Sequence, residues 1–405
     1  MANINSITPI LKEVYTPRIV EQLDNYTVFM SRLTKSSDNI SQEFGGKYVY
    51  FPIHVGRNSG IGSRLEDEVL PAAGQQKYDG GRVKLKYGYG AIRVTGPSVA
   101  LSDSNPKAFA KVITEETEGL TRDLGRDFNR QLFGNGNGAL GYFSAGSTGA
   151  TATIADSARG LGPDDYVDIY DAAGTATATG VRIVAVDYAT RAITFSAAQT
   201  VVASGFVTRA GSGRHAVQGN REITGLKSII SNTGVLYDID PALQPVWKAQ
   251  QLTKRANPVT IEEDMTLMTD QIFAAGGKTS LMITTQGVRR AYAKELMSLR
   301  QTVNRTEHEG GFSGLKFTSD GPSGEIEMLV DLDAPKGEIQ FLDMSDLTLY
   351  RDKAWSWLDR DGSMWKQDVS GGGPKDAWRA EMTEYHELAI SRRNTHGKIV
   401  SITEA

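Results

Sequence analysis

Apolar residues recur at steps of three and four positions between Ser102 and Gly138, a spacing that predicts one long amphipathic helix. Its expected start is Pro106, which follows three residues with capping side chains, and its expected end is Gly134. The apolar stripe consists of Phe109, Val112, Ile113, Leu120, Leu124, Phe128 and Leu132. About 28 residues that rise roughly 1.5 Å each give a rod on the order of 40 Å, so we expect this helix to be a spine.

The opposite face of the predicted helix carries charges of both signs at helical spacing. The pairs are Glu118 with Arg122, Asp123 with Arg126, and Asp127 with Arg130. Such a face is either solvated or in contact with another protein, and the pattern favours neither. Gly119 and Gly125 lie inside the helix, where each costs up to about 1 kcal/mol relative to Ala. We therefore expect something to pack closely against the helix at these glycines.

From Gly45 on, the residue pattern repeats every two positions, as in a β-strand. This pattern predicts a strand over residues 47–55 and a second strand over Arg82–Tyr89. Between them, Gly56–Gly81 is a polar, glycine-rich connection of a length that is uncommon in compact domains unless it is functional. Two strands with such a tip form a projecting arm. Because an isolated two-stranded ribbon is marginally stable in water, we expect Gly45–Thr95 to lack an adequate core of its own and to lie on a neighbouring molecule.

The segment 141–219 is rich in Ala, Thr, Gly and Val and is interrupted by turn signals, which predicts a small inserted β-domain resembling a barrel. Its strands are expected at Tyr166–Tyr170, Val181–Val186, Ala192–Phe195 and Phe206–Arg209.

Helical periodicity returns at Thr260, which forms a predicted capping box with Glu263. The expected later elements are a helix ending at Gly276, a strand over 280–284, a helix from Thr285, short strands over 311–362 and a closing strand over 398–402. The segment after Asp376 fits a helix and a strand equally well. At the other end, Thr16 and Pro17 mark a helical start within an N-terminal arm.

The composition excludes several kinds of site and partner but does not assign a function. The 405 residues carry a net charge of −4, which gives no general attraction for nucleic acid, and the chain has no cysteine, which excludes disulfides and thiolate zinc sites. We expect two or three structural units, folding in a reducing cytoplasm, no signal peptide and no membrane helix.

No motif in the chain is strong evidence for catalysis or for ligand binding. Gly136, Gly138 and Gly141 match a dinucleotide-binding pattern but follow a helix, and Gly276–Thr279 is better explained as a helix end than as a phosphate loop. The histidines have no metal-ligand spacing, so no catalytic, cofactor or metal site is predicted. Basic residues beside Tyr87 and Tyr89 could hold single-stranded nucleic acid, although a solvated strand face, or one paired with an acidic neighbour, is favoured. These basic residues are Arg82, Lys84, Lys86 and Arg93.

The order of these elements resembles the major capsid proteins of tailed bacteriophages. Local stretches are similar too, namely FPIHVGRNSGIGSR, RDFNRQLFGNGNG, LMITTQGVRRAYA and YHELAISRRNTHGKIV. The resemblance implies an α+β fold with an N-terminal arm (1–40), an extended β-hairpin loop (41–101) lying over a neighbouring subunit, a peripheral domain, an axial domain (277–371) and the inserted β-domain (141–219). The peripheral domain would contain the spine helix (102–140), its continuation (220–276) and the C-terminal strands (372–405).

The function that the resemblance implies is a non-enzymatic subunit of an icosahedral virion shell. It would assemble in the host cytoplasm into pentamers and hexamers that enclose double-stranded DNA without sequence-specific binding, with no cofactor or membrane. Because the chain begins almost at the arm, a separate scaffold protein or none is expected, and portal and decoration proteins are further possible partners. Expected interface residues are Tyr48, Tyr50, Arg57, Arg64, Glu66, Lys84, Lys86, Arg122, Arg126 and Arg130. The alternatives are a phage tube or decoration protein and an α/β nucleotide-binding enzyme.

Overall fold

The structure is a computed structural model that describes residues 28–36, 48–97, 106–155, 158–213, 219–299, 316–318, 323–359, 363–369 and 373–404. The chain divides into two compact units, which we describe separately. Unit 1 comprises the described residues within 1–33, 86–225 and 351–387, and unit 2 those within 34–85, 226–350 and 388–405. The predicted helix at Thr16 lies outside the described residues.

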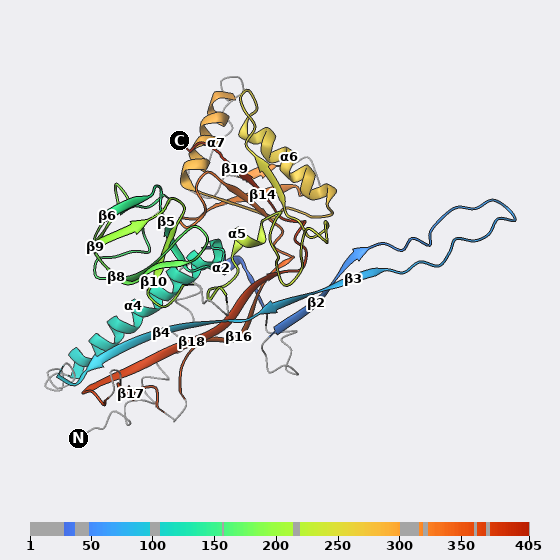
Figure 1. Ribbon diagram of the computed structural model, residues 1–405. Helices are drawn as coiled ribbons and strands as arrows, with labels where there is room; N and C mark the ends of the chain where they lie inside the picture. The colour runs from blue at the N-terminus through green and yellow to red at the C-terminus, as the bar shows by residue number, and fades with distance from the viewer. Residues whose placement is uncertain are drawn as a thin grey trace. The chain divides into compact units, whose positions relative to one another are not determined.

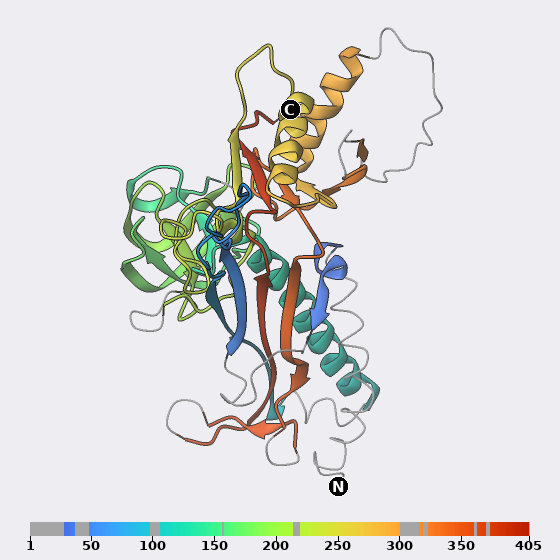
Figure 2. The ribbon, with the colours of Figure 1, turned by 90° about the vertical axis from the view of Figure 1, so that its right-hand side faces the viewer.

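Unit 1 is built on a sheet covered by the long helix. Strands β4 (Lys86–Thr95) and β18 (Ala377–Ile390) pair antiparallel from Thr95 opposite Ala377 to Lys86 opposite His386. In the same sheet, β17 (Lys366–Gln367) pairs with β18. Strand β16 (Leu347–Trp357) runs beside β18 (Figure 2).

Helix α4 (Pro106–Phe133) runs along β4 and matches the bounds of the predicted long helix almost to the residue (Figure 1). Leu120 and Leu124 pack on the tryptophan-rich core of this sheet. The backbone of β4 comes so close that a Cβ atom at Gly90 would lie 2.8 Å from Leu124 Cδ1. The close packing that we expected at Gly119 is wrong, since a Cβ atom there would meet nothing within 4 Å. A tight contact with this helix is made at Gly90 of the strand, and Gly125, the other glycine of the prediction, is buried.

The ambiguous segment after Asp376 is a strand, β18, and not a helix. It receives backbone hydrogen bonds from β4 on one side and from β17 on the other. Helical spacing of Trp378, Met382 and Tyr385 was compatible with the sequence, but pairing on both sides makes the extended conformation the stable one. In unit 1, the short helix α2 (Val28–Arg32) contributes Phe29, whose ring lies 5.5 Å from that of Phe133 in α4.

The residues that follow α4 form a six-stranded sheet in the order β5-β10-β7-β8-β9-β6. Its two edges are joined by a bridge between Phe143 and Ile154 and by a hydrogen bond of 2.7 Å from the Ala155 nitrogen to the Tyr142 oxygen. The strands are β5 (Ala139–Tyr142), β6 (Ser147–Thr153), β7 (Tyr166–Tyr170), β8 (Ala176–Asp187), β9 (Ala192–Val201) and β10 (Phe206–Arg209). Strands β7 and β10 have the predicted bounds, whereas β8 and β9 are longer than expected.

Unit 2 contains a mixed sheet in the order β11-β19-β15-β12-β14-β13. The strands are β11 (Gln250–Thr253), β12 (Leu281–Thr284), β13 (Lys316–Thr318), β14 (Glu325–Val330), β15 (Ile339–Leu342) and β19 (Gly397–Val400). Helices α6 (Ile261–Ala274) and α7 (Gln286–Leu299) supply Met265, Met268 and Val288 to its core. Unit 2 also contains the short helix α5 (Leu226–Ile229), and β1 (Thr34–Ser36) pairs in parallel with the first residues of β16.

Helix α6 confirms the boundary signals in the sequence. Thr260 Oγ1 accepts a hydrogen bond of 3.2 Å from the Glu263 nitrogen, and Glu263 Oε2 accepts one of 3.2 Å from the Thr260 nitrogen. At the other end, Gly276 has φ of 82°, and the Gly277 nitrogen donates to the Ile272 oxygen. The segment 276–279 is therefore a helix end, as predicted.

The arm of unit 2 is a ribbon of β2 (Tyr48–Gly56) and β3 (Lys77–Lys84). The single strand predicted over Arg82–Tyr89 is wrong, because the chain forms two strands that meet at Leu85. The first belongs to unit 2 and the second, β4, to unit 1. The basic residues at 82–93 consequently do not share one strand.

Candidate subunit-interface surface

The most prominent surface feature of unit 2 is the loop between β2 and β3, residues 57–76, which we call the projecting loop. It continues the ribbon as two limbs (Figure 1). The limbs approach each other closely where two glycines face, since a Cβ atom at Gly60 would lie 2.7 Å from the Gly74 nitrogen. The Gly60 nitrogen also donates a hydrogen bond of 2.7 Å to Asn58 Oδ1. These contacts fix the shape of the loop at its neck.

Beyond the neck, the loop closes in a tight turn. The Glu68 nitrogen donates to the Leu65 oxygen at 3.2 Å, and the Leu65 nitrogen donates to Glu68 Oε2 at 3.0 Å. Asp67 has φ of 69°, in the left-handed region that Asp tolerates better than most residues. Arg64 braces the turn through a hydrogen bond of 3.0 Å from Nε to the Val69 oxygen. The turn is therefore organised by its own side chains.

Large aliphatic side chains in this loop point into solvent. The four are Ile61, Leu65, Val69 and Leu70, with exposed fractions of 84%, 77%, 89% and 80%. Burying such a side chain contributes on the order of 2 kcal/mol. Four of them on a shaped loop form an exposed apolar surface of the kind that marks a protein contact. Sequence analysis missed these residues, although four aliphatic residues within a polar loop were a readable signal.

The base of the ribbon, in contrast, has a core within its own unit. Val49 and Val83 are fully buried. The ring of Phe51 lies 6.0 Å from that of Tyr237 and 6.1 Å from that of Trp247. The expectation that all of Gly45–Thr95 lacks a core is therefore wrong. Within the described residues 48–95, only the projecting loop has no buried side chain, because the ribbon rests on the segment around Tyr237 and β4 belongs to another sheet.

The predicted interface residues are spread over both units. In unit 2, Tyr48 lies opposite Lys84 in the ribbon, and Tyr50 is 57% exposed. The projecting loop contributes three exposed residues, Arg57, Arg64 and Glu66. In unit 1, Arg122 and Arg126 are exposed on α4, whereas the Lys86 ammonium donates to the Asn220 oxygen. The structure thus brings together only those on the ribbon and its loop, and an interface role remains a prediction for each.

Arg130 is turned mostly into its own unit, with its side chain 17% exposed, and an interface role for it stays a prediction. Its guanidinium pairs with Asp127 at 3.0 Å and donates to the Ala139 oxygen at 2.9 Å and to Glu222 at 2.5 Å. Burial acts to raise the pKa of Asp127, but the charges of Arg130 and Arg209 outweigh it and hold that pKa below its usual value. This cluster fastens the end of α4 to the strand that follows it.

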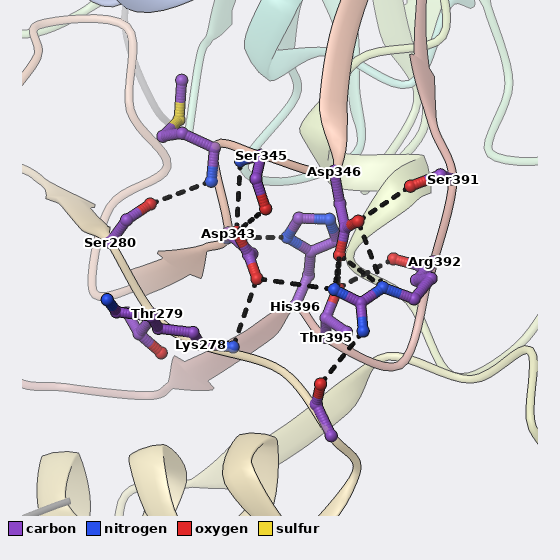
Figure 3. Close-up of polar contacts among 12 residues, drawn as sticks. Lys278, Thr279, Ser280, Asp343, Ser345, Asp346, Ser391, Arg392, Thr395 and His396 are labelled. Atoms are coloured by element: carbon purple, nitrogen blue, oxygen red, sulfur yellow. Dashed lines mark hydrogen bonds and ion pairs between the residues drawn. The ribbon is translucent and has the colours of Figure 1, made fainter. Parts of the chain in front are cut away.

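A buried polar cluster organises the C-terminal stretch of unit 2 (Figure 3). The Asp346 carboxylate accepts hydrogen bonds from Ser391 and Thr395, each at 2.8 Å, and pairs with Arg392 at 2.9 Å. His396 Nδ1 accepts from the Asp343 nitrogen at 3.2 Å. These contacts tie the turn between β18 and β19 to the turn between β15 and β16, which explains the run of polar residues in SRRNTH.

This cluster predicts acid sensitivity of the unassembled chain. His396 is fully buried, and burial lowers its pKa to about 4, so the folded state holds the neutral ring. The unfolded chain binds the proton below its ordinary pKa of roughly 6.5, and stability is lost as pH falls from there to about 4. We expect His396 to account for about 2 kcal/mol of lost unfolding free energy between pH 7 and pH 5.

The measurement is urea unfolding at both pH values, with His396→Gln as the comparison. The variant should lose less stability than the parent over this interval, because Gln does not titrate. An equal loss in parent and variant would contradict the assignment.

Within the described residues, no group of three or more His, Asp or Glu side chains is placed to hold a metal ion. None of the described helices is long and apolar enough to cross a membrane.

The chain resembles solved phage capsid structures along almost its whole length. A chain of the cyanophage A-1(L) capsid asymmetric unit is 15% identical with a TM-score of 0.54, and the alignment covers 98% of this chain and 93% of that one. A chain from Mycobacterium phage Bobi is 10% identical with a TM-score of 0.46, covering 98% and 99%. A capsid chain of a native GTA particle is 10% identical with a TM-score of 0.42, covering 88% and 86%.

No known family model and no curated protein sequence matches the chain. The likeness to the cyanophage chain nevertheless shows a shared fold, and it confirms the mixed α+β fold of a phage capsid protein that the resemblance implied.

Proposed function

We propose that this chain is the structural subunit of a phage capsid and that its work is self-assembly. The observation that carries the proposal is the projecting loop, which presents Ile61, Leu65, Val69 and Leu70 to solvent on a turn fixed by its own hydrogen bonds. Such a surface gains stability by burial on a neighbouring copy. The whole-length fold likeness to a cyanophage capsid chain supports the same conclusion.

The contact that the loop would make is heterologous, because a loop on one copy meets a different surface on the next. Repetition of a heterologous contact closes into rings, which fits pentamers and hexamers in a virion shell around double-stranded DNA. In this arrangement residues 57–76 are the part of the predicted extended loop that crosses to a neighbour. The spine helix and its sheet would form the peripheral domain, 277–371 the axial domain, and the sheet with bridged edges within 141–219 the barrel-like insertion. Scaffold, portal and decoration proteins would be further partners.

Negative-stain electron microscopy of the purified chain tests the proposal directly. We expect closed shells of uniform diameter, together with protection of residues 57–76 from proteolysis only in the assembled fraction. A chain that stays monomeric at high concentration with the projecting loop already protected would overturn the proposal. Tubes or small trimers would replace it with the tube or decoration alternative.

A further inference from the structure

Three basic residues stand side by side on the exposed face of the unit 1 sheet. Arg93 of β4 lies opposite Arg379 of β18, and Arg379 lies opposite Lys366 of β17. Directly opposed residues share a face, and neighbouring strands are about 4.8 Å apart, so the row spans on the order of 10 Å. Like charges placed directly opposite one another destabilise a sheet. We call these three residues the cation row.

Carboxylates of the same unit compensate the cation row in part. Arg93 pairs with Asp368 at 2.7 Å, and Arg379 pairs with Glu381 at 2.8 Å. The Arg93 and Arg379 side chains nevertheless remain 50% and 47% exposed, and each guanidinium has five N–H donors, so both retain donors that face solvent. The sheet thus offers fixed donors for a further anionic group.

The surface around the cation row is hollowed in two adjoining places. One cavity of about 220 Å³ is lined by Arg93, Arg379 and Lys375. The other, of about 290 Å³, shares Arg379 and adds the apolar side chains of Leu358, Met364 and Val369. The first cavity is therefore cationic, and the second, which adjoins it, is partly apolar.

The partner that fits this surface has carboxylates next to aliphatic side chains. With Lys375, the cation row places four cations around the two carboxylates of Asp368 and Glu381, which leaves an excess of two positive charges. Two carboxylates balance this excess, whereas a continuous phosphate backbone brings further negative charges onto Asp368 and Glu381, which disfavours nucleic acid. The projecting loop has the complementary chemistry, since Glu66 and Asp67 form its turn and exposed Leu65 and Val69 flank them. Opposite charges arranged in this way fix register more than they add raw affinity.

We propose that the cation row receives the Glu66–Asp67 turn of the projecting loop of a second copy, with an aliphatic side chain of that loop entering the adjoining apolar cavity. This inference rests on the proposed function and assigns the receiving surface. The Arg379 guanidinium, central in the row, is the principal donor to the Glu66 carboxylate.

Cross-linking between introduced cysteines tests the contact, because the chain has no cysteine of its own that could react with the cross-linker. In shells of the Glu66→Cys/Arg379→Cys variant, a short bismaleimide should produce a ladder of covalent oligomers on a denaturing gel. The matched control is Glu66→Cys/Lys248→Cys, in which the second cysteine replaces an exposed lysine of unit 2 instead of Arg379. This control should produce no ladder.

Charge exchange provides the second test. The yield of shells should fall at least tenfold for Arg379→Glu and for Glu66→Arg. The variant with both substitutions should recover most of the parent yield. The control Lys248→Glu should assemble normally. Circular dichroism of the unassembled variants verifies that each is folded.

The outcomes separate the two proposals. If the parent chain forms shells, but the paired cysteines do not cross-link and Arg379→Glu assembles normally, the receiving surface is wrong while the capsid function stands. If Arg379→Glu instead only weakens binding of a labelled DNA duplex, the cation row is a nucleic-acid contact and the inference is overturned. A parent chain that forms no shells overturns the proposed function itself.

Discussion

Removing residues 57–76 should leave a folded chain that forms no closed shells. Gly56 and Lys77 are opposite each other in the ribbon, so an Asn-Gly pair can join them as a two-residue turn. The buried base around Val49 and Val83 remains intact. Assembly should fall below detection, since the loss of four exposed aliphatic side chains, on the order of 2 kcal/mol each, removes the largest apolar contact that the loop can make.

Sedimentation and electron microscopy measure shell formation, and a thermal melt measures the fold. A full-length control in which Ile61, Leu65, Val69 and Leu70 are all replaced by Ser keeps the length of the loop and should fail to assemble as well. Shells of normal form from either variant would refute the role of the loop. The deletion ends at residue 76 because Lys77–Gly80 pair with β2 and belong to the ribbon.

Replacing Arg393 by Met should strongly destabilise unit 2. Its side chain is buried and donates to four carbonyl oxygens, at 2.9 Å to Ser228, 3.0 Å to Ile229, and 3.2 Å to both Thr233 and Gly234. Burial lowers the pKa of Arg393 to about 10, so the guanidinium is still charged at neutral pH. Loss of charged donors to several buried acceptors costs about 3–5 kcal/mol, a large part of the stability of an ordinary domain.

The matched control is Arg392→Met, which makes the same chemical change one residue earlier. The Arg392 side chain is 49% exposed, and Ser391 and Thr395 continue to donate to Asp346 when it is removed. Urea unfolding should therefore show a much smaller loss for Arg392→Met than for Arg393→Met. Equal losses for the two variants would show that the buried carbonyls are satisfied without Arg393.

Several elements were predictable because their signals are local. The spine helix is bounded by Pro106 and Gly134, and α6 has both halves of its capping box within four residues. Strands β7 and β10 have turn signals close to both ends. In each case the residues that decide the conformation lie within a few positions of it, so they can be read from the chain.

The sequence by itself therefore determined helices α4 and α6, strands β7 and β10, the resemblance to phage capsid proteins and the presence of a long polar connection before β3. Only the tertiary structure decided that β4 pairs with β18, that Arg130 pairs with Glu222, and that Arg93, Arg379 and Lys366 are side by side. The first and the third depend on the register between strands far apart in the chain, and the second depends on which distant segment packs beside the end of α4. Register is set by which strand faces become buried together, and the residues next to a strand in the sequence do not reveal it.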